Sequence, residues 1–137
     1  MNLTNFQLST SNATWVDVNP QYGMDNLPDR LPDELAISQC SLFSLFNCVP
    51  GQRARIFQPE YGSEWLQFIH EPIIDITAAK MQLYMIDAIT RWEPRIQINK
   101  NLTYVVADTN IPGYAVSIGF IMPGFSNPQQ IQFQVQL

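Results

Sequence analysis

A change of structural period at Pro94 constrains the fold of this chain more than any other feature of its sequence. Residues 77–91 carry apolar side chains at helical spacing, whereas apolar and polar residues alternate, as in a strand, from Ile96 onward. Proline lacks an amide hydrogen and disfavours helical backbone in the residue before it, so we expect the helix to end near Glu93. The chain must therefore turn a rigid corner here, with Glu93 and Arg95 on either side of the proline.

The opposite charges of Glu93 and Arg95 can serve this corner in two ways. Arg95 can pair with Glu93, Asp87 or Glu60 and lock the corner from within, in which case removal of one partner would be costly. Alternatively, the charges can present a clamp to another chain. The residues themselves leave both uses open.

The first of two main helices is expected over residues 34–48. Asp33 can cap it through its side-chain oxygen, and Pro50 follows its end. Cys40 and Cys48 both fall on this helix, where eight residues separate them by about 12 Å along the axis, too far for a disulfide. We therefore interpret both as small buried thiols in a reducing compartment.

The second main helix is expected from Thr77, which can act as its N-cap, with Ile76 and Met81 spaced as a hydrophobic staple. A shorter helix capped by Ser63 is expected before it, after a turn over residues 59–62. The apolar stripe of the long helix is interpreted as core. It consists of Met81, Met85, Ala88, Ile89 and Trp92.

The last third of the chain predicts an antiparallel sheet. Apolar residues alternate over 96–106, 114–122 and 131–137, and turn residues separate these segments. The expected fold class is therefore α+β, with a small antiparallel sheet of three or more strands packed against two main helices. Residues 1–32 are rich in polar residues and proline and are expected to form an extended N-terminal arm. Residues 33–137 are expected to form one domain.

The terminal strand has an unusual composition. Glutamines separate its apolar residues, Ile131, Phe133, Val135 and Leu137, and it contains no charged residue or proline. Soluble proteins commonly use such residues to protect a strand edge from pairing with other chains. This strand can therefore add to a strand of another chain, or it can pair within its own sheet with its glutamines facing water. Both can hold, because a strand has two edges.

Composition narrows the range of functions. The net charge is −5 and the seven Lys and Arg residues are scattered, so we expect no nucleic-acid binding. No apolar run is long enough to span a membrane, and no secretory signal is visible. Only 14% of the residues are charged, which suits either a subunit covered by neighbours or a surface solvated by amides and hydroxyls. His70 is the only histidine, so we expect no metal site and no cofactor.

Four groups of residues follow one another along the chain: Gly51-Gln52-Arg53, Phe57-Gln58-Pro59-Glu60-Tyr61-Gly62, His70-Glu71-Pro72 and Trp92-Glu93-Pro94-Arg95-Ile96. Their order resembles the gene-25-like baseplate wedge family of contractile-tailed phages. This family is related to baseplate subunits of type VI secretion systems. The resemblance covers residues 33–137 and implies a structural subunit of the virion's tail baseplate, assembled in the host cytoplasm, rather than an enzyme.

The resemblance also implies roles for particular residues. Glu93, Pro94 and Arg95 would dock the subunit on the helical core of the wedge. The sheet over residues 96–137 would then act as a sheath initiator, offering the first ring of the tail sheath a template for strand addition. The residues that would hold the turn beneath the corner are Arg53, Pro59 and Gly62, and those that would pair with the sheath are Ile131, Phe133, Val135 and Leu137.

The expected partners are therefore the baseplate wedge proteins and the tail sheath protein, with tail tube and hub proteins as further candidates. Two other functions remain as alternatives. One is a lysozyme-like enzyme that cleaves peptidoglycan, which would need two carboxylates flanking a cleft. The other is a tail-completion or adaptor protein that makes no contact with the sheath.

Overall fold

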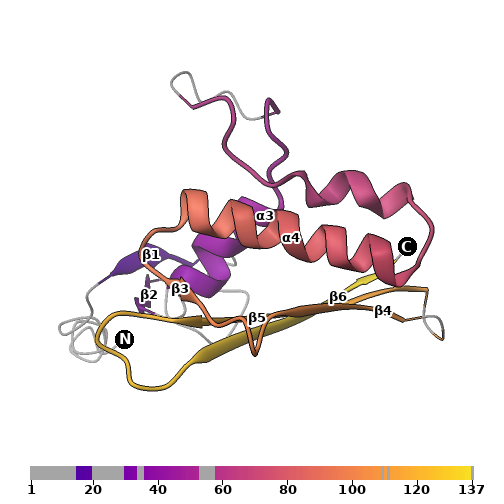
Figure 1. Cartoon of the computed structure of the whole chain (residues 1–137). Helices are drawn as coiled ribbons and strands as arrows, with labels where there is room; N and C mark the ends of the chain where they lie inside the picture. The colour runs from indigo at the N-terminus through magenta and orange to yellow at the C-terminus, as the bar shows by residue number, and fades with distance from the viewer. Residues whose placement is uncertain are drawn as a thin grey trace, which may run out of the picture. The chain divides into compact units, whose positions relative to one another are not determined.

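The computed structural model describes residues 15–19, 30–33, 36–52, 58–108, 110 and 112–136. They belong to two compact units, Met1–Ser44 and Leu45–Leu137, which we describe separately (Figure 1). No helix among the described residues is long and apolar enough to cross a membrane.

The first unit contains a short two-stranded ladder. Strands β1 (Val16–Val18) and β2 (Arg30–Pro32) pair in antiparallel orientation. The ladder continues past its strands, because the Asp33 amide donates to the Trp15 carbonyl at 2.7 Å and the Asp33 carboxylate accepts from the Trp15 amide at 3.1 Å. The described parts of residues 1–32 thus include regular strands, and the extended arm stays a prediction.

The first main helix differs from the prediction in type and length. It consists of a π-helix, η1 (Ala36–Leu42), followed by α3 (Phe43–Phe46). The helix therefore ends before Cys48, and the expectation that both cysteines share it was wrong. Cys40 and Cys48 are nevertheless buried free thiols. The Cys40 thiol donates to the Val18 carbonyl at 3.2 Å, and burial raises its pKa.

The second unit is built on a four-stranded antiparallel sheet. The strands are β3 (Gln97–Ile98), β4 (Tyr104–Asp108), β5 (Gly113–Ile121) and β6 (Gln129–Gln136). Strand β5 is central, with β6 along one edge and with β4 and β3 following each other along the other edge (Figure 1). This arrangement confirms the expected sheet and the order of its three predicted strands.

The first predicted strand is broken between β3 and β4. Ile98 lies opposite Phe120 and Tyr104 opposite Ser117, so six steps along this strand span only three steps of β5. The extra residues form a turn in which the Leu102 amide donates to the Asn99 carbonyl at 3.1 Å. The turn adds three residues, an odd number, and therefore exchanges the two faces of the strand. Val105 is buried in β4, whereas Tyr104 and Val106, which the alternation grouped with Ile96, are 43% and 50% exposed.

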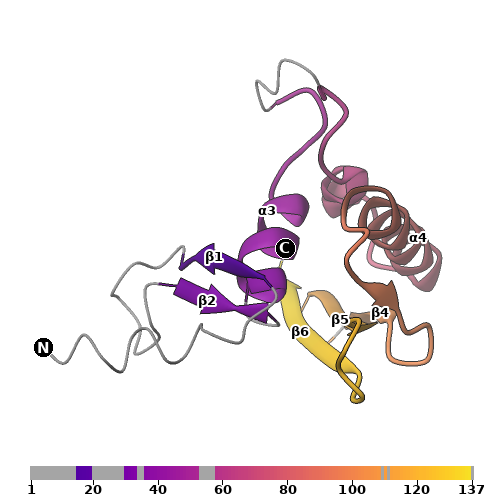
Figure 2. The ribbon, with the colours of Figure 1, turned by 90° about the vertical axis from the view of Figure 1, so that its left-hand side faces the viewer.

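One long helix, α4 (Asp75–Trp92), covers one face of the sheet (Figure 1). Its predicted stripe is confirmed as core from Met81 to Ile89, and Trp92 is half-buried. Figure 2 shows α4 nearly end-on, with the sheet along one side of it. The buried residues of β5 complete the core between helix and sheet. They are Tyr114, Val116, Ile118 and Phe120.

Neither of the residues predicted to cap these helices, Thr77 and Ser63, acts as a cap. Helix α4 begins at Asp75, so Thr77 is buried inside its first turn and does not cap it. The predicted staple was also wrong, because Ile76 is 67% exposed. A 3-10 helix, η2 (Glu64–His70), follows Ser63 as expected, but the Ser63 hydroxyl makes no capping hydrogen bond and is buried without a partner. His70 lies exposed at the end of η2.

Candidate docking and strand-pairing sites

The corner after α4 is locked by an ion pair. The Arg95 guanidinium donates to both carboxylate oxygens of Glu93, from Nε at 2.5 Å and from Nη2 at 2.7 Å. The Glu93 side chain is 3% exposed and the Arg95 side chain 35% exposed, so the acid lies inside and the base at the surface. Bidentate pairs of this kind are strong and geometrically specific. The intervening Pro94 is exposed.

The helix ends at this corner for the predicted reason. Glu93 is the last residue whose amide donates to the helix, with its hydrogen bond to the Ile89 carbonyl at 2.8 Å. Pro94 has no amide to continue the series. The Ile96 amide then donates to the Glu93 carbonyl at 3.4 Å, which closes the turn into the sheet.

The turn at residues 59–62 lies beside this corner. The rings of Tyr61 and Trp92 meet edge to face with their centroids 5.4 Å apart, and the Arg91 guanidinium lies 4.9 Å from the Trp92 ring. Such ring contacts stabilise by about 1 kcal/mol beyond the area they bury. Tyr61 was not singled out from the sequence, since nothing in the pattern of residues around it indicates a contact with a helix thirty residues away.

Pro59 and Gly62, two of the residues predicted to hold this turn, lie against the loop after α3. The Pro59 carbonyl accepts from the Gly51 amide at 2.8 Å. Gly62 has a φ of +134°, and a Cβ there would lie 2.3 Å from the Cys48 carbonyl oxygen, which accepts from the Ser63 amide. Gly62 is therefore required by both backbone conformation and space. The third residue, Arg53, lies outside the described residues.

Strand β6 has one edge that faces away from β5. In the described part of the chain it pairs with β5 alone. The Val135 carbonyl oxygen lies against Gly113 of β5. Since backbone groups of successive residues point to opposite edges, the odd-numbered residues of β6 direct their amides toward β5. The even-numbered glutamines, such as Gln132, direct theirs toward the outer edge.

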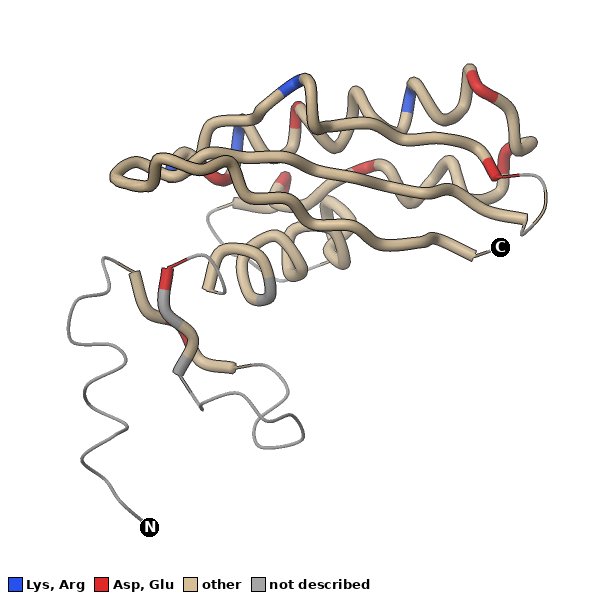
Figure 3. The backbone as a smooth tube through the Cα atoms, turned by 90° about the horizontal axis from the view of Figure 1, so that it is seen from below, with Lys and Arg blue, Asp and Glu red and all other residues tan. Residues whose placement is uncertain are grey.

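The side chains of β6 follow the predicted alternation. Ile131, Phe133 and Val135 are half-buried, while the glutamines at 130, 132, 134 and 136 are exposed. Phe133 packs against Phe46 with ring centroids 6.1 Å apart, so the strand is anchored in its own unit. Figure 3 shows β6 without a charged residue along its length. Leu137 lies outside the described residues.

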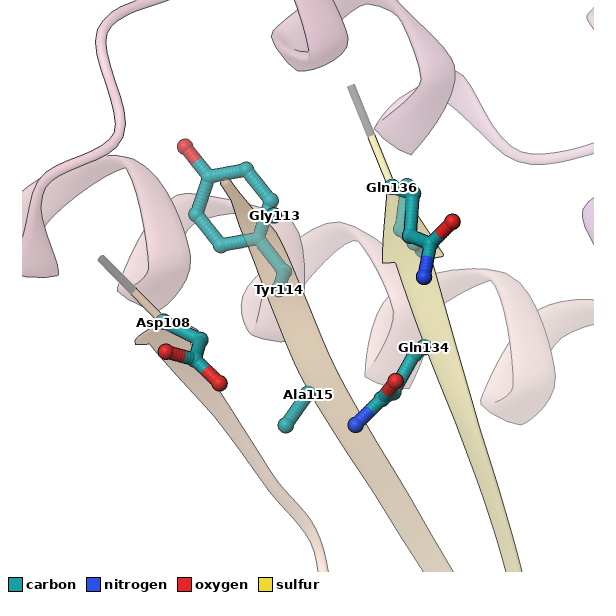
Figure 4. A pocket seen from close by; sticks show the side chains of 7 residues that line it. Asp108, Gly113, Tyr114, Ala115, Gln134 and Gln136 are labelled. Carbon is teal, nitrogen blue, oxygen red and sulfur yellow. The ribbon is translucent and has the colours of Figure 1, made fainter. Parts of the chain in front are cut away.

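A small pocket lies where β4 and β6 end and β5 begins (Figure 4). Its volume is about 10 Å³, which is enough for about one water molecule. It holds one carboxylate, Asp108, which accepts from the Asn110 amide at 2.9 Å. The lining residues are Asp108, Gly113, Tyr114, Ala115, Gln134, Val135 and Gln136. A pocket of this size does not admit a polysaccharide strand.

The acids that could serve a lysozyme-like site lie on different elements of the fold. Glu93 is buried and paired with Arg95, while Glu60, Glu64 and Asp87 are exposed on the turn, on η2 and on α4. Within the described ranges, no three of the His, Cys, Asp and Glu residues gather closely enough to hold a metal ion.

The part of the chain that contains the corner and the turn at 59–62 matches a known protein family. Residues 36–110, more than half of the chain, match the family model of baseplate wedge protein gp25. No curated relative matches the chain.

Two solved structures share the fold. One is a crystal structure of a proposed tail lysozyme from Geobacter sulfurreducens, with a TM-score of 0.59, 15% identity, and coverage of 71% of this chain and 85% of that chain. The other belongs to the baseplate of pyocin R2 after contraction, with a TM-score of 0.51, 19% identity, and coverage of 90% of this chain and 99% of that chain. At these identities the likeness shows the fold alone.

Proposed function

We propose that this chain, which belongs to the family of baseplate wedge protein gp25, initiates the tail sheath of a contractile particle. In this function the chain docks on the wedge core through its corner and offers β6 to the first ring of sheath subunits. The observation that carries the proposal is the outer edge of β6, which combines a regular strand with an uncharged sequence.

A growing sheath faces a nucleation problem that such an edge can solve. If each ring adds strands to the ring before it, the first ring has no layer to bind. A subunit held in the baseplate supplies that layer, with backbone hydrogen bonds for affinity and the alternating side chains for register. Movement of the baseplate would then reach the first sheath ring through the same paired strands.

The corner residues differ in burial and therefore have different functions in docking. Glu93 is too deeply buried to touch a partner, so it holds Arg95 in place. Pro94 and the exposed part of Arg95 form the surface that meets the wedge core. The Tyr61–Trp92 contact stabilises this surface, because it joins the turn at 59–62 to the end of α4.

The outer edge of β6 can be tested without removing the strand. Truncation is a poor test, since Phe133 packs in the unit. Gln132→Pro instead removes one outward amide, and proline is tolerated at a strand edge. Gln132→Ala is the matched control, because it removes the same side chain and keeps the amide.

The assay mixes purified sheath protein with baseplates that carry either variant, and extended sheaths are counted by electron microscopy. We expect about tenfold fewer sheaths with Gln132→Pro than with Gln132→Ala, at equal incorporation of the chain into baseplates. Equal counts would reject the sheath initiator and favour an adaptor without sheath contact.

A further inference from the structure

The outer edge of β4 is engaged by a side chain of α4. The Gln82 side-chain nitrogen, Nε2, donates to the Thr103 carbonyl at 3.2 Å, and the Gln82 oxygen, Oε1, accepts from the Val105 amide at 3.4 Å. One side chain thus bonds a carbonyl and an amide that lie two residues apart on the same stretch of backbone. We call these two hydrogen bonds the Gln82 bridge.

The Gln82 bridge occupies the groups that another strand would need. Because Gln82 reaches them from α4, the Thr103 carbonyl and the Val105 amide point away from β5, while Tyr104 between them lies opposite Ser117 of β5. One residue of an added parallel strand would donate its amide to this carbonyl and accept with its own carbonyl from this amide. The Gln82 side chain supplies the same donor and acceptor, and so takes the place of that residue.

The β4 and β6 edges of the sheet therefore differ. Helix α4 lies over the β4 side of the sheet, away from β6 (Figure 2). A side chain of the helix can thus reach the β4 edge, whereas β6 pairs with β5 alone in the described part of the chain. Proteins commonly protect the sheet edges that must not pair with other chains.

We propose that Gln82 confines strand addition to β6, by closing the β4 edge to other chains. The inference deepens the proposed function, on which it rests for the use of β6 by the sheath, and it assigns the residue that determines which edge is available. With both edges open, β6 of one copy could pair with β4 of the next, and such head-to-tail contacts extend into filaments. With only β6 open, pairing stops at a closed dimer.

Gln82→Ala in the full chain tests the proposal in free solution, without sheath or baseplate proteins. Sedimentation velocity measures the size of the particles over a range of protein concentrations. We expect the parent to be no larger than a dimer, and Gln82→Ala to form larger assemblies as the concentration rises. Gln97→Ala is the matched control, because Gln97 is an exposed glutamine of β3, and it should sediment as the parent does.

A double variant separates edge pairing from general aggregation. Gln82→Ala combined with Gln132→Pro opens the β4 edge and removes an outward amide of β6, so the filament loses one of its two pairing edges. This variant should again be no larger than a dimer. Large assemblies that persist in the double variant would overturn the proposal, because their contacts would not depend on β6.

The Val105 amide reports on the β4 edge itself. Its hydrogen exchange should be about tenfold faster in the double variant than in Gln132→Pro alone, because Gln82 no longer accepts from it. In the assemblies of Gln82→Ala it should be protected again, since an added strand then accepts from it. Exchange that stays fast in those assemblies would show that they form at another surface and would overturn the proposal.

Gln82→Met has nearly the same length and no amide, so it should assemble as Gln82→Ala does. Loss of folding in both variants, measured by thermal unfolding, would overturn the proposal, because Gln82 would then serve to hold α4 on the sheet. A parent already larger than a dimer would also overturn it, and so would folded Gln82 variants that sediment as the parent does. Sheath counts with Gln132→Pro test the proposed function separately, so the two failures are distinguishable.

Discussion

Arg95 holds the carboxylate of Glu93 from two residues further along the chain, through two hydrogen bonds of 2.5 and 2.7 Å. The two functions that the sequence left open for the corner are therefore not exclusive. The pair locks the corner from within, and the exposed part of Arg95 remains accessible to a partner. Loss of the pair and loss of docking need separate measurements.

Arg95→Ala should destabilise the protein by about 2–4 kcal/mol, because it takes the Arg95 guanidinium away from the buried Glu93 carboxylate. Urea unfolding at pH 7 measures this free energy. Arg95→Lys, which keeps the charge and loses the bidentate geometry, should cost less. A loss below about 0.5 kcal/mol in Arg95→Ala would mean that the pair does not hold the corner.

Glu93→Gln separates the structural function from the lysozyme-like alternative. The substitution keeps the size of the side chain and removes its charge, so we expect a loss of about 1–2 kcal/mol in stability and weaker docking on wedge proteins. Release of soluble fragments from peptidoglycan should be absent in both forms. Hydrolysis by the parent chain that disappears in folded Glu93→Gln would establish the enzyme instead.

Gly62→Ala should cost about 2–4 kcal/mol, because a Cβ would meet the Cys48 carbonyl oxygen and the φ of +134° is unfavourable for alanine. Gly124→Ala is the matched comparison, since Gly124 has a φ of +92° but a Cβ there would meet no other atom within 4 Å. Thermal unfolding of both variants isolates the steric part. Equal losses would show that the loop after α3 moves aside without penalty.

Tyr114 predicts an alkaline loss of stability. Burial raises its pKa above the ordinary value of 10. A hydrogen bond with the Thr77 side chain offsets part of this rise in pKa, and the Glu71 carboxylate adds a smaller increase. Since the folded state keeps this proton more tightly than the unfolded chain, the stabilisation is complete below about pH 10 and declines as the pH rises further. Urea unfolding between pH 8 and 11 measures this decline.

Tyr114→Phe removes the hydroxyl that donates to the Pro72 carbonyl at 3.3 Å, at a cost of about 1 kcal/mol at pH 8. The difference between parent and variant should shrink above pH 10. Tyr104→Phe removes an exposed hydroxyl and controls for other alkaline effects. A difference that stays constant to pH 11 would contradict the assigned burial of the phenol.

Much of the fold follows from local patterns in the chain. Pro94 ends α4 because it has no amide to donate, and this holds whatever surrounds it. The predicted alternation of β6 is also observed, because one face of the sheet is buried and a one-residue shift would expose Phe133. Thr77 failed as a cap because burial beside the sheet outweighs the preference of threonine for helix starts.

The candidate sites, like the fold, could be predicted only in part from the sequence. The sequence alone determined the corner, the uncharged terminal strand and the family to which they point, because these are carried by neighbouring residues. Only the tertiary structure decided that Arg95 turns inward to Glu93, that Tyr61 meets Trp92, and that Ile76 and Leu83 remain outside the core. These facts depend on contacts between distant segments, and the spacing of residues along one segment does not specify which neighbour will cover it.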